Sequence, residues 1–127
     1  MMDTPPEIAV VVPFFDEEEA IAPFFAELLP VLQSLQRSFE VLAIDDGSSD
    51  RTFERLAEIQ ANEKHVRVIR FRRNFGQSAA LAAGFAETRA QVVVTMDGDL
   101  QNDPAEIPRL LEEIGRGADV VLSLIHI

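Results

Sequence analysis

The residues best suited to chemistry in this sequence are acidic pairs that directly follow short apolar runs. Asp97 and Asp99 flank Gly98 after the run at 92–96. Two carboxylates one residue apart on a tight turn can face one hard cation, and Mg²⁺ or Mn²⁺ leaves its other positions to water and substrate phosphates. Because Asp-Gly is also a common turn dipeptide, a polar turn with a helix cap is the alternative interpretation.

A second acidic pair, Asp45 and Asp46, ends the apolar run at 41–44. A carboxylate at this point could accept hydrogen bonds from a nucleobase or a ribose, as acidic residues do in other nucleotide sites. The alternative is that one of the two caps a helix that begins near Thr52. The segment 48–50 offers three other residues for that cap, which favours a ligand role for the pair.

Basic residues gather after the third apolar run. Arg70, Arg72 and Arg73 are three of only 11 basic residues in the chain. Their guanidinium groups suit a diphosphate, and Arg73 is the favoured contact because it leads into the following turn. Asn74 and Gln77 are further candidate polar contacts. The alternative is a solvated strand end with weak ion pairs.

Several other kinds of site are excluded or lack support. The absence of cysteine excludes a disulfide scaffold, a zinc-thiolate site and a thiol nucleophile. His65 and His126 are far apart in the sequence and are interpreted as incidental. Neither a Gly-x-Gly-x-x-Gly motif nor a Walker loop is present, so a dinucleotide cofactor and a P-loop nucleotide site have no support.

Strands and helices must alternate along the chain to position these residues. Runs at 8–12, 41–44, 66–69, 92–96 and 119–122 are β-branched and largely continuous in hydrophobicity, which is typical of strands covered on both faces. Between them, apolar residues recur at helical spacing. These residues include Ile21, Phe24, Phe25, Leu28 and Leu32 in one segment, Phe53 and Leu56 in another, and Ile107, Leu110, Leu111 and Ile114 in a third.

Helix boundaries follow from prolines and caps. Pro23 predicts that the first helix begins near Ala22, which leaves the acidic residues before it in a loop. Asp103, Pro104 and Glu106 form the pattern of a capping box at the start of the last helix.

Five strands alternating with four helices predict an α/β fold with a doubly wound, mostly parallel sheet and helices on both faces. In such a sheet, ligands bind beyond the carboxyl ends of the strands, where the strand order reverses. We therefore expect three acidic loops and one basic loop to converge on one edge, at 13–19, 45–50, 97–103 and 70–77.

Composition limits the class of protein. The chain has 127 residues, of which 47% are hydrophobic and 26% charged, as expected for a single ordinary globular domain. Its net charge of −11 argues against a general nucleic-acid or anionic-membrane surface. No apolar run approaches the roughly 20 residues of a membrane span, and the start lacks a signal-peptide pattern, so a cytoplasmic location is expected.

Four motifs together resemble the family 2 glycosyltransferases, which have the GT-A fold. Residues 12–18 read Val-Pro-Phe-Phe-Asp-Glu-Glu and are similar to the family's Val-Pro-x-Tyr-Asn-Glu-Glu opening. The resemblance runs from about residue 8 to residue 122 and is to the polyprenyl-phosphate sugar transferases, such as dolichol-phosphate mannose synthase and the bacterial undecaprenyl-phosphate glucosyl- and aminoarabinosyltransferases. The other motifs are 45–52, 73–77 and 97–104 with 106–108.

The resemblance implies inverting transfer of a sugar from a UDP- or GDP-linked donor to a polyprenyl phosphate, with Mg²⁺ or Mn²⁺ as cofactor. It implies that Asp97 and Asp99 bind the metal that bridges the diphosphate, and that Gln101 lies near the sugar or metal; these three are the candidate catalytic residues. The residues implied for the nucleotide site are Pro13, Phe15, Glu17, Asp45, Asp46 and Arg73.

The sequence departs from the family at two points. Phe15 and Asp16 stand where the family has Tyr and Asn. In the family, the strand at 119–121 leads to an Arg-containing loop, acceptor-site elements and often membrane helices, and residues 123–127 match none of these. We therefore expect residues 1–122 to be the donor-binding portion of a longer protein. Membrane association is expected through parts outside this chain, and an open sheet edge could pair with a second copy.

Three other functions remain open from the sequence. A receiver-type phosphoacceptor domain has a similar length and an acidic Mg²⁺ pocket, but it needs a lysine after the fifth strand, and Lys64 is the only lysine here. A sugar-nucleotidyltransferase carries a glycine-rich basic loop after the first strand, where this chain is acidic. A non-catalytic nucleotide- and metal-binding fragment is the third possibility.

Overall fold

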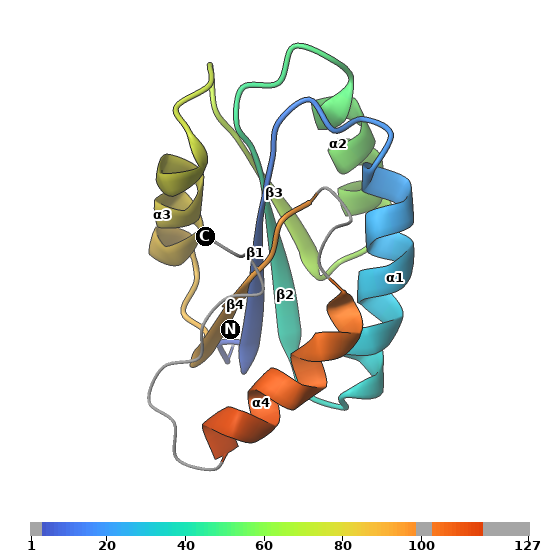
Figure 1. Ribbon diagram of the computed structural model, residues 1–127, viewed down its shortest axis with the longest axis vertical. Coiled ribbons are helices and arrows are strands. Elements are labelled where there is room, and N and C mark those ends of the chain that lie inside the picture. Colours follow the sequence, from blue (N-terminus) through green and yellow to red (C-terminus); the bar gives the residue numbers. More distant parts are fainter. Residues whose placement is uncertain (1–3, 99–102, 116–127) are drawn as a thin grey trace.

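The computed structural model describes residues 4–98 and 103–115. Strands and helices alternate along the chain, as predicted (Figure 1). The elements are β1 (Ile8–Phe14), α1 (Ile21–Ser34), β2 (Phe39–Asp45), α2 (Thr52–Asn62), β3 (Val66–Arg70), α3 (Gln77–Glu87), β4 (Val92–Thr95), the 3₁₀ turn η1 (Pro104–Glu106) and α4 (Ile107–Gly115). The strand predicted at 119–122 lies outside the described residues.

The described strands form one parallel sheet in the order β3-β2-β1-β4. β1 is central and pairs with β2 on one side and with β4 on the other. The chain therefore moves outward from β1 to β3 and then crosses back to the opposite side of β1. This reversal between β1 and β4 is the place where parallel sheets of this type bind ligands.

The two faces of β1 belong to separate hydrophobic clusters because side chains alternate along a strand. Val10, Val12 and Phe14 pack with residues of α1, α2 and α4. Val11 packs on the other face with Ala80 of α3 and with residues of β2. Figure 1 shows α3 alone on its face of the sheet and the other helices on the opposite face. The prediction of a doubly wound sheet is confirmed.

α3 lies very close to the sheet because its inward face carries small side chains. Ala80 and Gly84 are its buried residues. A Cβ atom added at Gly84 would lie 2.3 Å from Cγ1 of Val11, a distance that real packing does not allow. This close approach fixes the depth at which the start of α3 meets the carboxyl edge of the sheet.

The predicted helix starts agree with the structure to within a residue. α1 begins at Ile21, and Pro23 sits in the first turn, where a missing N–H costs no helical hydrogen bond. Asp103 caps the last helical segment by accepting a hydrogen bond from the Ala105 N–H at 3.0 Å. Across residues 4–98 and 103–115, no helix combines the length and apolar character needed to cross a membrane.

Candidate functional site

A cavity of about 330 Å³ lies at the carboxyl edge of the sheet, and we call it the central cavity. It is formed by residues that follow all four described strands, so the predicted convergence of the loops is confirmed. Its walls contain Pro13, Phe14, Phe15, Glu17, Asp46, Asn74, Gly76, Gln77 and Asp97. Of the nine residues predicted for the site, five therefore line this one cavity, namely Pro13, Phe15, Glu17, Asp46 and Asp97.

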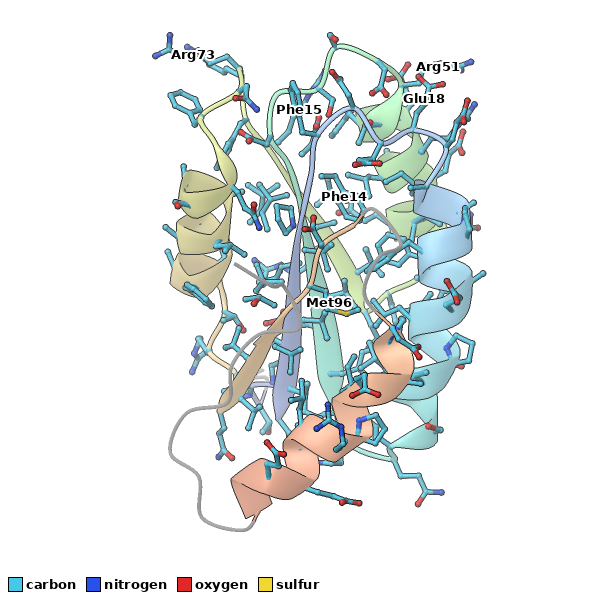
Figure 2. The ribbon with its side chains drawn as sticks, viewed as in Figure 1. Phe14, Phe15, Glu18, Arg51, Arg73 and Met96 are labelled. Carbon is cyan, nitrogen blue, oxygen red and sulfur yellow. The ribbon has the colours of Figure 1, made fainter. Side chains whose placement is uncertain are left out.

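Two consecutive phenylalanines point to different surroundings (Figure 2). Phe14 is buried and packs edge-on against Phe24, with the ring centroids 5.6 Å apart. Phe15 is 45% exposed and lies on the wall of the central cavity. Of the two rings, Phe15 is therefore the one accessible to a ligand.

Asp97 lies in the wall of the central cavity, and Gly98 holds the turn that carries it against the core. A Cβ atom at Gly98 would lie 2.3 Å from Cε1 of Phe14. The glycine is therefore needed for close contact with the buried ring. Asp99 and Gln101 lie outside the described residues, so their predicted metal and sugar contacts remain predictions.

Asp46 connects the loop after β2 to the segment before α3. The residue is only 4% exposed. Oδ1 accepts a hydrogen bond from the Phe75 N–H at 2.8 Å. Oδ2 accepts from Nδ2 of Asn74 at 2.9 Å and from the Gly76 N–H at 3.1 Å. The side chain thus lines the cavity and also fixes part of its wall.

Asp45 is fully buried and is not among the residues that line the central cavity. Its Oδ1 accepts a hydrogen bond from the Ser48 N–H at 3.0 Å. Within the described residues, Oδ2 has no hydrogen-bond partner, and Nε of Arg70 lies 3.9 Å away. Burial places Asp45 behind the surface that a ligand reaches, and its ligand role stays a prediction.

The arginines do not line the central cavity. The Arg73 guanidinium lies 4.8 Å from the centroid of the Phe75 ring, and Figure 2 shows it at the outer end of its loop. Arg70 and Arg72 border a separate hollow of about 280 Å³. This arrangement does not place Arg73 in the wall of the central cavity, and its contact with a diphosphate stays a prediction.

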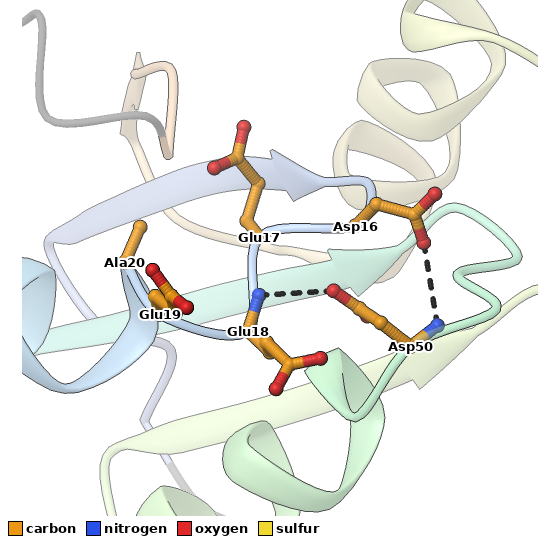
Figure 3. A pocket seen from close by; sticks show the side chains of 6 residues that line it. All are labelled: Asp16, Glu17, Glu18, Glu19, Ala20 and Asp50. Carbon is orange, nitrogen blue, oxygen red and sulfur yellow. Dashed lines mark hydrogen bonds between the residues drawn. The ribbon is translucent and has the colours of Figure 1, made fainter.

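A larger hollow of about 550 Å³ is lined by Asp16, Glu17, Glu18, Glu19, Ala20 and Asp50 (Figure 3). Its carboxylates join the loops after β1 and β2. Asp16 Oδ1 accepts from the Ser49 N–H at 2.9 Å, and Asp50 Oδ2 accepts from the Glu18 N–H at 3.2 Å. Asp16 has φ of 50°, a left-handed conformation that Asp and Asn tolerate better than other non-glycine residues.

Asp50 also performs the capping task that the sequence left open among several residues. Its Oδ1 accepts a hydrogen bond from the Thr52 N–H, at the start of α2, at 2.8 Å. Burial alone would raise the pKa of Asp50, but the hydrogen bonds from Thr52 and Glu18 lower the pKa below its ordinary value of 3.8. Asp50 is thus structural: the sequence offered it as one possible cap, whereas its hydrogen bond with the Glu18 N–H became apparent only in the structure.

The carboxylates that face the central cavity do not form a complete metal site by themselves. In the part of the chain that the structure describes, no group of three or more His, Cys, Asp or Glu side chains is placed to hold a metal ion. Mg²⁺ sites that also bind substrate phosphates commonly use only one or two protein carboxylates. The position of Asp97 in the cavity wall fits a site of that kind.

Comparison with known proteins agrees with the sequence motifs and the fold. Residues 9–127 match the sequence profile of Glycosyl transferase family 2. The chain belongs to this family. It is 41% identical over 122 residues to the undecaprenyl-phosphate 4-deoxy-4-formamido-L-arabinose transferase of Pectobacterium carotovorum subsp. carotovorum (strain PC1). That match covers 95% of this chain but only 37% of the relative, so the chain spans little more than a third of the relative's length.

Solved structures of glycosyltransferases share the fold. Glucosyl-3-phosphoglycerate synthase from Mycobacterium tuberculosis, solved with uridine diphosphate, superposes with a TM-score of 0.70 at 26% identity, covering 88% of this chain and 41% of that one. The mannosyltransferase PcManGT from Pyrobaculum calidifontis, solved with GDP-Man and Mn²⁺, has a TM-score of 0.60 at 21% identity, covering 76% and 28%. The predicted α/β fold class of this glycosyltransferase family 2 chain is confirmed.

Proposed function

We propose that this chain forms the donor-binding portion of a metal-dependent, inverting glycosyltransferase that transfers a sugar from a nucleoside diphosphate to a polyprenyl phosphate. The observation that carries the proposal is the central cavity, where an exposed aromatic ring and the carboxylates of Asp46 and Asp97 meet at the reversal of strand order. The relatives that the sequence matches are named as undecaprenyl-phosphate sugar transferases.

The donor nucleotide is proposed to occupy the central cavity. The exposed ring of Phe15 offers a flat apolar surface on which a base can stack, and Glu17, Asn74 and Gln77 supply polar groups around it. A fold neighbour was solved with UDP and another with GDP-Man. Both UDP- and GDP-linked donors are therefore kept as candidates.

The metal ion is proposed to bind at Asp97 together with Asp99. Carboxylate oxygens are the ligands that Mg²⁺ and Mn²⁺ prefer, and Gly98, which separates the two acids in the sequence, packs closely against Phe14. A bound divalent ion would neutralise negative charge that builds on the departing nucleoside diphosphate. The Mn²⁺ in the structure of PcManGT supports this choice of cofactor.

The acceptor is proposed to be a polyprenyl phosphate at the cytoplasmic face of a membrane. Its phosphate oxygen is already anionic near neutral pH, so a general base matters less than for a sugar hydroxyl. Catalysis then depends mainly on holding donor and acceptor in line, which this chain does for the donor. We propose that acceptor and membrane contacts come from the part of the relatives that this chain does not span.

Melting temperature measured with Mn²⁺ and either UDP or GDP tests the proposal. One nucleotide with Mn²⁺ is expected to raise the melting temperature of the chain, because a ligand that binds the folded state stabilises it. Asp99→Ala should remove the increase, whereas Glu58→Gln, which removes an exposed carboxylate from an ion pair on α2, should keep it. An unchanged melting temperature in the intact chain with both nucleotides contradicts the proposal.

Turnover separates an enzyme from a binding fragment. Incubation with a nucleotide sugar and a polyprenyl phosphate should yield the glycosylated lipid phosphate if this chain alone can catalyse the transfer. Binding of nucleotide and metal without product favours the non-catalytic fragment.

A further inference from the structure

The carboxylate of Asp46 organises the segment that connects β3 to α3. The Asp46 carboxylate accepts hydrogen bonds from three consecutive residues, through the Asn74 amide, the Phe75 N–H and the Gly76 N–H. The Asn74 amide also donates to the backbone carbonyl of Asp46 at 3.2 Å. A single residue of the β2 loop thus receives four hydrogen bonds from three consecutive residues.

The anchored segment forms one wall of the central cavity. Asn74, Gly76 and Gln77 line the cavity, and Gly76 precedes the first residue of α3. Gly76 has φ of 105°, a backbone conformation that residues other than glycine rarely adopt. The negative charge of Asp46 also lies at the N-terminal end of α3, where the helix dipole favours an anion.

Gly47 brings the two loops into direct backbone contact. A Cβ atom at this position would lie 2.1 Å from the carbonyl carbon of Arg73 and 2.3 Å from the Asn74 nitrogen. The absence of a side chain at Gly47 therefore lets the β2 loop approach closely enough for Asp46 to reach Asn74 and the residues after it.

The hydrogen bonds leave little of Asp46 for a ligand. Oδ2 already accepts two of them and Oδ1 one, and the residue is 4% exposed. An ionised carboxylate has about four acceptor positions, so most of its capacity is used inside the protein. Asp46 therefore acts on a bound donor through the segment that it holds, in addition to any contact by its remaining acceptor position.

We propose that Asp46 is a positioning residue, which sets donor affinity by fixing residues 74–76 in the wall of the central cavity. This inference rests on the proposed function in taking the ligand to be a nucleoside diphosphate. Replacing the carboxylate with an amide exchanges one acceptor oxygen for an NH2 group, which faces N–H donors and leaves part of these partly buried donors without an acceptor. The segment then leaves its native position, and the wall that Asn74 and Gly76 form is lost.

The test is Asp46→Asn with two independent measurements on the full chain. Calorimetric titration with UDP or GDP in Mn²⁺ should show affinity reduced about tenfold, as expected when hydrogen bonds to a charged group are lost. Amide hydrogen exchange should show faster exchange at Phe75 and Gly76. Glu58→Gln should match the wild-type chain in both measurements, since Glu58 is an exposed residue of α2.

Asn74→Ala provides a second variant if Asp46→Asn does not fold. It keeps the carboxylate and removes only the amide donor, so the Phe75 and Gly76 amides should exchange faster than in the wild-type chain. Unchanged exchange at both amides in whichever variant folds overturns the proposal.

The two measurements also separate the inference from the proposed function. Weaker nucleotide binding by Asp46→Asn with unchanged amide exchange overturns positioning and indicates direct contact with the ligand. Faster exchange with unchanged affinity overturns the link between the segment and the donor. A wild-type chain that binds neither nucleotide refutes the proposed function and, with it, the donor-affinity part of the inference, while exchange still decides whether Asp46 holds residues 74–76.

Discussion

Carboxylates at the carboxyl edge of the sheet serve two purposes that residue type does not distinguish. Asp97 lies in the wall of the central cavity, where its carboxylate oxygens can serve as ligands to a metal ion. Asp50, in contrast, accepts backbone hydrogen bonds that tie two loops together. Asp46 is involved in both, since it lines the cavity and holds the segment before α3. The same type of acidic side chain can therefore bind a ligand, hold the backbone of another segment by hydrogen bonds, or do both, depending on which N–H groups surround it.

The lowered pKa of Asp50 predicts a pH-dependent contribution to stability. Because its folded-state pKa lies below the ordinary 3.8, the contribution is present above that value and disappears as pH falls through the lowered pKa. Asp50→Asn should therefore destabilise the chain at pH 7 and have a smaller effect near the acid end of the folded range. Urea unfolding of both proteins at several pH values measures the difference.

An equal effect of Asp50→Asn at every pH would show that the ionised carboxylate is not the stabilising species. Glu19→Gln is the matched control, since Glu19 lies in the same hollow and is exposed. It should change the free energy of unfolding little at either pH, as surface substitutions usually do.

At the scale of elements, the depth of α3 against the sheet controls one wall of the cavity. The helix begins with Gln77, a cavity residue, and its inner face rests on β1 and β2 through Ala80 and Gly84. Hydrogen bonds between the loops after β1 and β2 hold the residues on either side of Glu17, which also lines the cavity. Packing contacts of residues that do not themselves line the cavity, such as Ala80 and Gly84, thus determine where its polar groups lie.

Gly84→Ala should destabilise the chain although alanine is the better helix former by about 1 kcal/mol. The new Cβ would lie 2.3 Å from Val11 Cγ1, so α3 or β1 must move, at a cost of about 1–3 kcal/mol. The same movement should weaken nucleotide binding, because α3 carries part of the wall. Chemical denaturation and nucleotide titration measure the two effects.

Ala82→Val is the control for Gly84→Ala, since it adds bulk on the exposed side of the same helix. It should lower the free energy of unfolding only slightly, by about 0.5 kcal/mol, through helix propensity. Equal destabilisation by the two substitutions would mean that contact with the sheet does not limit the size of residue 84.

At the scale of the whole molecule, net charge opposes the proposed ligand. The chain carries a charge of −11, and among the described residues no arginine lines the central cavity. A nucleoside diphosphate is also strongly negative. Binding of the diphosphate therefore depends on a positive charge placed between it and the carboxylates, which is the part that a divalent ion can play.

Removing the divalent ion should lower nucleotide affinity by at least about tenfold, because a charge pair about 4 Å apart near a protein surface is worth several kcal/mol. Titration with UDP or GDP in Mn²⁺, and again with excess EDTA, measures the change. EDTA should leave the melting temperature of the nucleotide-free chain unchanged. Equal affinity with and without the ion would contradict a metal-dependent donor site.

Much of the fold could be predicted from local sequence. β-branched runs became the strands, and Pro23 and Asp103 placed helix starts to within a residue, because these preferences act over a few neighbouring residues. The sequence did not specify the order of the strands in the sheet, because right-handed crossovers allow more than one order. The loops of the site were nevertheless predicted to meet, because parallel strands end at one edge of the sheet. That meeting is seen in the central cavity.

By itself, the sequence determined the family, the alternation of strands and helices, and which acidic residues follow which strand. Tertiary structure alone decided what each acid does, because a carboxylate's role depends on donors supplied by distant segments. Asp46 faces N–H groups of residues 75 and 76, and Asp45 is enclosed away from the cavity. Gly47, Gly84 and Gly98 depend likewise on neighbours that only the folded chain brings within a few ångströms.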